Sequence, residues 1–404
     1  MKKVHVDLVP DPTRCSGCGA CAVACPRQAI TMQAGKGGFV YPVINHDACI
    51  GCGKCVRVCA YQAGTDGQMP AAAYAAVGKC DALTQNSASG GIFATLAMSW
   101  IKAGGLVAGA VMDCSPQVQV YHVLSGKKED IQRMQGSKYV QSEAWRCYRD
   151  VLDALAQGRQ VLFTGTPCQV AAIKRLTGNP EHLTTIDLIC HGVPPLVMLD
   201  EYIRLLEKRF RGKIERFSFR DKRIGKRYCT SLKISKGTRN QQMFLQSSDQ
   251  SFYRYFLKSV ISRENCYTCP YARLERVSDL TIGDYWGVEK QHASDFVRGR
   301  MSPRSDWSCI LVNTSKGTAL LQGYGEMIER HPSQAEWVAA ENHQLCHPTV
   351  KPAERERVLG LYEQGGYAAV EKEFIRSMSG ALRYRLRLWK HLRALQKHNE
   401  GQKT

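Results

Sequence analysis

The chain has 404 residues, of which 44% are hydrophobic and 23% charged, and its formal net charge is +19. This length allows two or three domains with a buried core, and the composition is ordinary for a globular protein. Because the N-terminus lacks the apolar core of a secretory signal, we expect a cytoplasmic protein whose 18 cysteines do not form a disulfide framework. The basic charge favours anionic ligands or acidic partners over nucleic acid.

The first cysteines follow the spacing C-x2-C-x2-C-x3-C twice in succession. This tandem pattern is typical of a bacterial two-cluster [4Fe-4S] ferredoxin, in which the fourth cysteine of each run binds the other cluster. We therefore expect a ferredoxin domain over residues 1–66, with short strands at 29–32 and 41–44. The predicted ligands are Cys15, Cys18, Cys21 and Cys59 for cluster 1, and Cys49, Cys52, Cys55 and Cys25 for cluster 2. The alternative, zinc knuckles, usually takes its cysteines from separated C-x2-C pairs.

Two segments follow that can be mistaken for other structures. Residues 67–79 are polar and then alanine-rich, and we interpret them as a linker. Residues 92–112 are almost wholly apolar and about long enough to cross a bilayer, but Lys102 and Gly104-Gly105 divide them. We expect a buried helix, a turn and a strand there rather than a transmembrane helix.

From residue 80 onward, short apolar segments such as VLFTG, TTIDLIC and CILVN alternate with helix-like runs. This pattern predicts an α/β domain with a mixed sheet, and thus an α+β chain overall. The domain has no G-x-G-x-x-G sequence, so a dinucleotide-binding Rossmann site is not supported.

Several motifs in this domain point to ligands. The turn at 87–91, SASGG, precedes a helix and suits a phosphate, although a simple helix cap is the alternative. Cys168 and Cys190 each follow a predicted strand, where α/β sheets usually bind ligands, and Cys266 and Cys269 form a close pair. Together these four soft ligands are enough for a third cluster, although a lone cysteine is more often a small buried hydrophobe.

The ordered motifs resemble the coenzyme F-420 (deazaflavin) hydrogenase/dehydrogenase beta-subunit family over residues 80–325, with a ferredoxin domain fused in front. The motifs are Gly90-Gly91, the GSKY sequence at 136–139, TPCQ at 166–169, LICHG at 188–192, CYTC at 266–269 and DLTIGDYWG at 279–287. The resemblance implies a third [4Fe-4S] cluster on Cys168, Cys190, Cys266 and Cys269. It also implies FAD, with the predicted contacts Ser89, Gly90, Gly91, Ser137, Lys138, Thr164, Gly165, Thr166, Asp284 and Trp286.

Some of these residues have competing interpretations. Lys138 can offset pyrophosphate charge or be a solvated surface lysine, and Asp284 and Trp286 can flank the flavin or serve packing. His191 is a candidate proton donor to substrate or flavin, or it orients a neighbour. The remaining cysteines lack paired spacing, and we interpret them as structural: Cys80, Cys114, Cys147, Cys229, Cys309 and Cys346.

Three further segments are notable, two of them for their basic residues and one for its helical pattern. Residues 208–227 hold ten Lys and Arg against two acids, and Arg220, Lys222 or Arg223 can reach an anionic substrate, a partner or RNA. Residues 326–375 are expected to be a helical extension. Residues 376–404 predict a basic amphipathic tail that either lies on an anionic membrane, binds a partner or frays into solvent.

These features predict an iron–sulfur flavoprotein oxidoreductase that passes electrons between ferredoxin-type clusters and FAD. Its substrate would be a deazaflavin or another small, possibly anionic metabolite, with a redox partner protein or ferredoxin. One alternative is an electron-transfer subunit of a hydrogenase, dehydrogenase or reductase. Another is a metal-stabilised interaction or RNA-binding protein.

Overall fold

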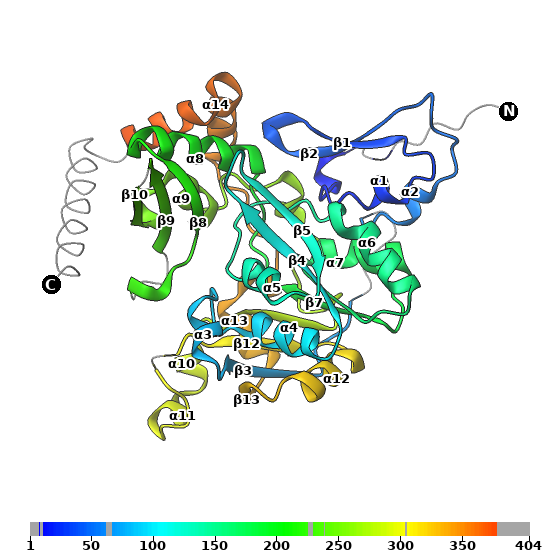
Figure 1. The fold of residues 1–404 in the computed structure, drawn as a ribbon, viewed down its shortest axis with the longest axis vertical. Coiled ribbons are helices and arrows are strands. Elements are labelled where there is room, and N and C mark those ends of the chain that lie inside the picture. The colour runs from blue at the N-terminus through cyan, green and yellow to red at the C-terminus, as the bar shows by residue number, and fades with distance from the viewer. Residues whose placement is uncertain are drawn as a thin grey trace.

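The computed structural model describes residues 8, 11–61, 67–224, 229–237, 239–303 and 305–377. Figure 1 shows an N-terminal domain at the upper right, a large sheet covered by helices, and a smaller sheet at the upper left. The strands are β1 (Ile30–Ala34), β2 (Val40–Ile44), β3 (Ala72–Gly78), β4 (Leu106–Asp113), β5 (Gln119–Ser125), β6 (Val161–Gly165), β7 (Leu183–Leu188), β8 (Lys213–Ser218), β9 (Cys229–Lys236), β10 (Arg239–Gln246), β11 (Leu280–Asp284), β12 (Ser308–Val312) and β13 (Ile328–Ser333).

The helices vary from single turns to six turns. They are α1 (Ala20–Ala24), α2 (Lys54–Arg57), α3 (Asp81–Gln85), α4 (Ile92–Lys102), α5 (Lys128–Met134), α6 (Trp145–Ala156), α7 (Pro167–Thr177), α8 (Leu196–Phe210), α9 (Ser251–Leu257), α10 (Val288–Gln291), α11 (Ala293–Val297), α12 (Ser315–Tyr324), α13 (Ala335–Glu341) and α14 (Arg355–Ser377). We call the described residues up to 61 the N-terminal domain and those from 67 onward the larger domain.

The N-terminal domain consists of the hairpin β1–β2 and the short helices α1 and α2. The two strands pair antiparallel from Ile30 opposite Ile44 to Ala34 opposite Val40, which confirms the strands expected at 29–32 and 41–44. Each helix begins after a glycine in the left-handed region, Gly19 before α1 and Gly53 before α2. The domain therefore has an internal symmetry that follows the repeat in its sequence.

The large sheet is mixed, with the order β13-β3-β12-β11-β7-β6-β4-β5. Strands β4, β6, β7 and β11 are parallel neighbours, and β3 runs in the same direction because both β3 and β11 are antiparallel to β12. Every residue of β6 is buried, as expected for a strand covered on both faces. The expected α+β class and mixed sheet are thus confirmed.

The alanine-rich segment is a strand of this sheet, so its interpretation as a linker was wrong. Within residues 67–79, β3 lies between β12 and β13, and Ala73, Ala75 and Ala76 are almost completely buried. Small side chains let neighbouring layers approach the strand closely. Because alanine is only weakly hydrophobic, the sequence of β3 lacks the apolar pattern by which a buried strand is predicted. The expected helical extension at 326–375 also begins with a strand, β13, before α13 and α14.

Residues 92–112 form helix α4, a turn and strand β4, as the sequence predicts. Helix α4 packs its apolar residues against the large sheet, with Leu96, Ala97 and Trp100 in the same core as Val107 and Val111 of β4. None of the helices described here combines the length and apolar character needed to cross a bilayer.

The smaller antiparallel sheet, β10-β9-β8, packs with α8, α9 and α14 around an aromatic core. Tyr202 of α8 stacks on Phe252 of α9 with ring centroids 5.9 Å apart, and Tyr367 of α14 meets Tyr202 edge-on at 5.6 Å. The basic segment 208–227 begins in α8 and continues through β8 of this sheet. The predicted tail at 376–404 lies outside the described residues except for the end of α14.

Candidate redox site

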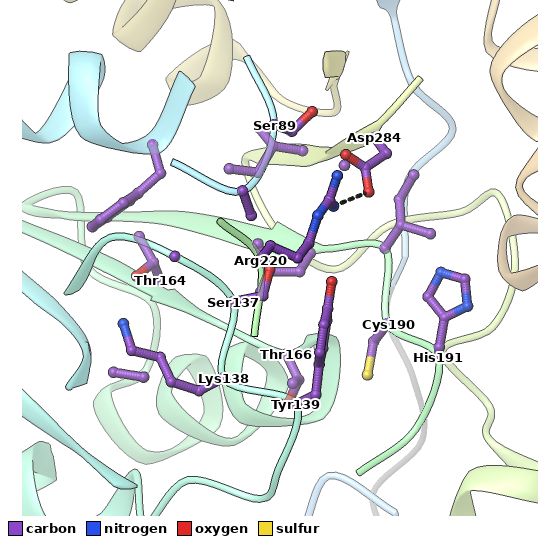
Figure 2. Close-up of a pocket in the computed structure, with 18 of the residues that line it drawn as sticks. Ser89, Ser137, Lys138, Tyr139, Thr164, Thr166, Cys190, His191, Arg220 and Asp284 are labelled. Carbon is purple, nitrogen blue, oxygen red and sulfur yellow. Dashed lines mark hydrogen bonds and ion pairs between the residues drawn. The ribbon is translucent and has the colours of Figure 1, made fainter. Parts of the chain in front are cut away.

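A cavity of about 350 Å³ opens at the carboxyl ends of the strands that run together in the large sheet (Figure 2). Its wall includes segments that follow β3, β6, β7 and β11, which is where ligands usually bind in α/β sheets. Among the predicted FAD contacts, all except Gly90 line this cavity: Ser89, Gly91, Ser137, Lys138, Thr164, Gly165, Thr166, Asp284 and Trp286.

The turn before α4 presents an uncapped helix N-terminus to the cavity. Gly91 has a φ of 78°, and no side chain caps the first turn. Ser308 of β12 holds the turn in place, because Gly90 N donates to Ser308 Oγ and Ser308 Oγ donates to Ser89 Oγ, each at 2.9 Å. Free N–H groups at a helix start favour a negatively charged ligand, as the sequence motif predicts.

The ammonium group of Lys138 forms three hydrogen bonds inside the protein. It donates to the carbonyl oxygens of Arg133, Met134 and Gln135 at 3.0, 2.7 and 3.0 Å, at the end of α5. Desolvation, with Arg216 and Arg133 nearby, lowers the pKa of Lys138 to about 7. All three ammonium hydrogens point to α5, so a direct bond to a phosphate would require this arrangement to change.

The loop after β6 joins the cavity wall to α7. Thr166 caps α7 through a capping box, in which its backbone N donates to Gln169 Oε1 at 3.0 Å. Pro167 is the first helical residue and Cys168 is the second. The same cap therefore positions a wall residue of the cavity and a predicted cluster ligand.

An ion pair lies across the cavity between residues that are 64 positions apart. Arg220 Nη1 is 2.6 Å from Asp284 Oδ2, and the Arg220 side chain is only 6% exposed (Figure 2). Burial opposes the charge on Arg220, but Tyr139 and Asp284 together raise its pKa above the ordinary value. The sequence indicated Arg220 only as one of several basic residues, because nothing in it marks the pairing with Asp284.

Beyond β8, the basic segment 208–227 turns toward the cavity at Arg220 and Lys222. Lys222 donates to the carbonyl oxygens of Thr84 and Ser89, and its Nζ is 3.2 Å from Asp306 Oδ2. These bonds tie the segment to the turn before α4. Arg220 and Lys222 are therefore engaged inside the protein, whereas RNA binding would require solvent-facing cations.

His122 of β5 is a lining residue that the sequence analysis missed. The residue is 2% exposed, and Nε2 donates to the Thr164 carbonyl oxygen at 2.9 Å. Since Nε2 then carries the proton, Nδ1 is an acceptor, and it has no partner in the part of the chain that the structure describes. Burial lowers the pKa of His122 to about 4. No motif surrounds this histidine, so only the fold brings it to the cavity.

Cys190 and His191, which follow β7, line both the large cavity and a second cavity of about 40 Å³. His191 is an exposed residue, but the protein around its imidazole removes part of the ring's hydration and lowers its pKa. The negative charge of Asp284 opposes this shift. In Figure 2 His191 and Cys190 lie side by side on the wall of the large cavity. This position agrees with either predicted role of His191, proton donation or orientation of a neighbour.

The second cavity brings together all four predicted ligands of the third cluster. Cys168 comes from α7, Cys190 from the loop after β7, and Cys266 and Cys269 from the 3-10 helix at Glu264–Thr268 and the residue after it. Burial raises the pKa of the Cys190 thiol to about 12 and that of Cys168 to about 11. Among the described residues that line this cavity none is a carboxylate, so the donor set is soft and fits a cubane.

The N-terminal domain holds two similar cavities, of about 30 and 20 Å³. In each, the fourth cysteine of one run lies with the three of the other, which agrees with the predicted exchange. The first is lined by Cys15, Cys18, Cys21 and Cys59, and the second by Cys25, Cys49, Cys52 and Cys55.

No group of three or more His, Cys, Asp or Glu side chains in the described structure is arranged around a single metal ion. A cubane places each thiolate on a different iron, so its ligands stand further apart than those of one ion. The cysteines interpreted as structural lie outside the three cysteine-lined cavities described here: Cys80, Cys114, Cys147, Cys229, Cys309 and Cys346.

Both domains of the chain match families of known proteins. Residues 158–334 match the C-terminal part of the family described as "Coenzyme F420 hydrogenase/dehydrogenase, beta subunit", and residues 14–63 match the "4Fe-4S dicluster domain". This part of the larger domain is therefore similar to the C-terminal part of the beta-subunit family. The expected resemblance and the fused two-cluster domain are thereby confirmed, and with them an iron–sulfur protein of the oxidoreductase class that transfers electrons.

A solved structure of the F420-reducing [NiFe] hydrogenase complex from Methanosarcina barkeri contains a chain that is similar to this one. The sequence identity is 15% and the TM-score 0.44, over 74% of this chain and 94% of that chain. No curated protein matches the chain.

Proposed function

We propose that the chain is an iron–sulfur flavoprotein oxidoreductase, in which three [4Fe-4S] clusters exchange electrons with one FAD. Clusters 1 and 2 belong to the N-terminal domain. The third belongs to the larger domain and is held by Cys168, Cys190, Cys266 and Cys269. The substrate is a deazaflavin coenzyme or another small metabolite.

The continuity of the cavities carries this proposal. Ser16, which follows Cys15 of cluster 1, lines the cavity of the third cysteine set. Cys190 and His191 line that cavity and also the large one. The cofactor sites therefore adjoin one another from the N-terminal domain to the large cavity, as electron transfer over short steps requires.

The lining of the large cavity fits a dinucleotide such as FAD. The uncapped start of α4 favours a phosphate group, and His122 Nδ1 offers a buried acceptor for a hydroxyl or amino group. Bound FAD would supply the conversion between one-electron and two-electron transfer. His191 lies on the wall between the two cavities, where it can hold or give a proton.

Anaerobic purification with iron, sulfide and flavin analysis tests the proposal. Three cubanes predict about twelve irons per chain, together with about one FAD. About eight irons would leave the two clusters of the N-terminal domain and remove the third. A preparation without flavin after reconstitution with FAD would contradict the flavoprotein assignment.

Cys168→Ala tests the ligand set of the third cluster. We expect this variant to lose about four of the twelve irons, because a cubane needs its fourth thiolate. Cys147→Ala is the matched control, since Cys147 is a buried cysteine of α6 that lines none of the cysteine cavities. A Cys168→Ala protein with the full iron content would exclude Cys168 as a ligand.

The family name favours a second candidate, an electron-transfer subunit without a substrate of its own. The larger cavity would then hold a flavin that serves a partner protein. Copurification of a stoichiometric partner, with no turnover by the isolated chain, would support this candidate. Turnover of a small molecule by the isolated chain would exclude it.

A further inference from the structure

Arg263 of the larger domain reaches into the N-terminal domain beside cluster 1. Its side chain is fully buried, and it precedes the 3-10 helix that carries Cys266. Its backbone N donates to the Val193 carbonyl oxygen at 3.0 Å, and Val193 lines the cavity of the third cysteine set. The backbone of Arg263 therefore belongs to one cluster site and its guanidinium group to the next.

The guanidinium group is held in one position by bonds to both domains. Nε donates to the Cys15 carbonyl oxygen at 2.7 Å and Nη2 to that of Val40 at 2.8 Å. Nη1 donates to Gln141 Oε1 at 3.1 Å, and the guanidinium lies 4.2 Å from the centre of the Tyr41 ring. Gln141 in turn donates to two carbonyl oxygens of the N-terminal domain, at 3.0 and 3.1 Å.

These contacts leave the positive charge without a carboxylate partner among the described residues. A buried cation is costly unless an anion accompanies it. The thiolates of cluster 1 can supply the missing anion, because Arg263 Nη2 lies 3.8 Å from Cys15 Sγ. A cubane with four thiolates is an anion, and reduction adds a further negative charge.

We propose that Arg263 raises the reduction potential of cluster 1 above that of cluster 2, so that electrons collect at the cluster next to the third cysteine set. This inference rests on the proposed function, since it requires the clusters to be present. A nearby cation and an N–H···S bond both stabilise the reduced cluster. Their effect is large here because the site is buried and poorly screened.

Cluster 2 has no equivalent among the described residues that surround its cavity. The cations that line its cavity, Arg27 and Lys54, are both exposed. Arg57 follows them in α2 and is exposed too, and its Nη1 donates to the Cys52 carbonyl oxygen at 3.2 Å rather than to sulfur. Cys52 is exposed as well. Solvent screens an exposed charge, so Arg57 is the matched control for Arg263.

The test is a potentiometric titration of the reconstituted full chain, followed by electron paramagnetic resonance of the reduced clusters. In Arg263→Gln one cluster midpoint should move to lower potential and the spread between the two N-terminal clusters should shrink, while the third cluster shifts less. Arg57→Gln should leave every midpoint near its wild-type value. Arg263→Lys keeps the charge but loses the fixed fork of donors, and should move the same midpoint by less.

Iron analysis distinguishes a failure of the proposed function from a failure of the role of Arg263. Fewer than about twelve irons in the wild-type chain contradicts the proposed function itself. A fully loaded Arg263→Gln protein with wild-type midpoints overturns the role of Arg263 and leaves the proposed function standing. If Arg263→Gln does not take up iron, the wild type decides, and equal midpoints of the two N-terminal clusters overturn the inference.

Discussion

His122 has its charge state fixed by burial in the wall of the large cavity. Burial lowers its pKa to about 4, whereas an unfolded chain has the ordinary value of 6.5. As the pH falls, the unfolded state therefore takes up the proton first. The stability that neutral His122 contributes is complete above about pH 6.5 and is lost between about pH 6.5 and pH 4.

The replacement His122→Gln should make the protein less sensitive to acid. Glutamine does not titrate, and its amide can still donate to the Thr164 carbonyl oxygen. From about pH 7.5 to about pH 5, the wild type should lose about 2 kcal/mol more stability than the variant. Anaerobic thermal unfolding at a series of pH values measures this difference. Acid damage to the clusters affects both proteins equally, so it cancels when the variant is compared with the wild type.

The exposed His182 supplies the control, and His182→Gln should retain the wild-type pH dependence. If His122→Gln and the wild type have parallel curves, His122 is not held neutral by burial.

At the residue scale, spacing predicted the N-terminal cysteine ligands and the family resemblance predicted the third set, whereas contacts between single residues that only the fold assembles were missed. The cysteine runs could be found because a cubane imposes tight intervals on its ligands. The pair Arg220–Asp284 spans 64 residues, and His122 stands alone in a strand without a motif. Long-range contacts of single residues leave no local pattern to recognise.

At the scale of elements, the missed strand β3 explains why the turn at 87–91 faces the cavity. With residues 67–79 taken as a linker, the position of that turn relative to the sheet could not be inferred. As a strand that runs with β11 and β7, β3 delivers the turn to the same edge as the segments that follow them. Alanine-rich central strands are hard to predict because alanine favours helices over strands. Alanine is also too weakly hydrophobic to mark a buried segment clearly.

The replacement Gly90→Ala should displace the start of α4 and weaken flavin binding. A Cβ at Gly90 would lie 2.8 and 2.9 Å from the carbonyl oxygens of Ala76 and Asp306, and backbone atoms cannot rotate away. The turn must therefore move, with the N–H groups that follow it. We expect flavin affinity to fall about tenfold, equivalent to about 1.4 kcal/mol, in a titration of flavin-depleted protein with FAD.

The control for this change is Gly323→Ala in the exposed face of α12. Apart from the backbone of α12 itself and the two neighbouring residues, no atom lies within 4 Å of a Cβ at that position, and alanine stabilises a helix relative to glycine by about 0.5–1 kcal/mol. This variant should bind flavin normally and be slightly more stable. Unchanged flavin affinity in Gly90→Ala would show that the start of α4 does not contact the flavin.

At the scale of the whole molecule, the interface between the two domains is built around the proposed cluster sites. Asn265 Nδ2 donates to the Tyr61 hydroxyl at 2.5 Å, and the Tyr271 hydroxyl donates to the Ala60 carbonyl oxygen at 3.2 Å. The Tyr61 and Tyr271 rings meet edge-on at 5.9 Å. These residues flank Cys59 on one side and Cys266 and Cys269 on the other. The domains are thus fixed to each other where electrons would pass between them.

The internal symmetry of the N-terminal domain allows this coupling to be tested with two equivalent glycines. Gly19 and Gly53 precede α1 and α2 with φ of 75° and 69°, so alanine at either position costs about the same backbone strain, roughly 1–2 kcal/mol. Their surroundings differ. A Cβ at Gly19 would lie 2.6 Å from Trp145 Cβ in the larger domain, whereas the nearest atom to a Cβ at Gly53 is the flexible end of Arg57 at 3.4 Å.

Gly19→Ala should therefore push the domains apart at cluster 1, while Gly53→Ala should strain only the N-terminal domain. Rapid mixing with a reduced ferredoxin measures how fast electrons reach the flavin through the clusters. We expect the rate to fall several-fold in Gly19→Ala and to stay close to the wild type in Gly53→Ala, at equal iron content. Electron transfer falls steeply with distance, so a small displacement at this contact is enough. Equal rates in the two variants would mean that electrons do not pass to the flavin through this interface.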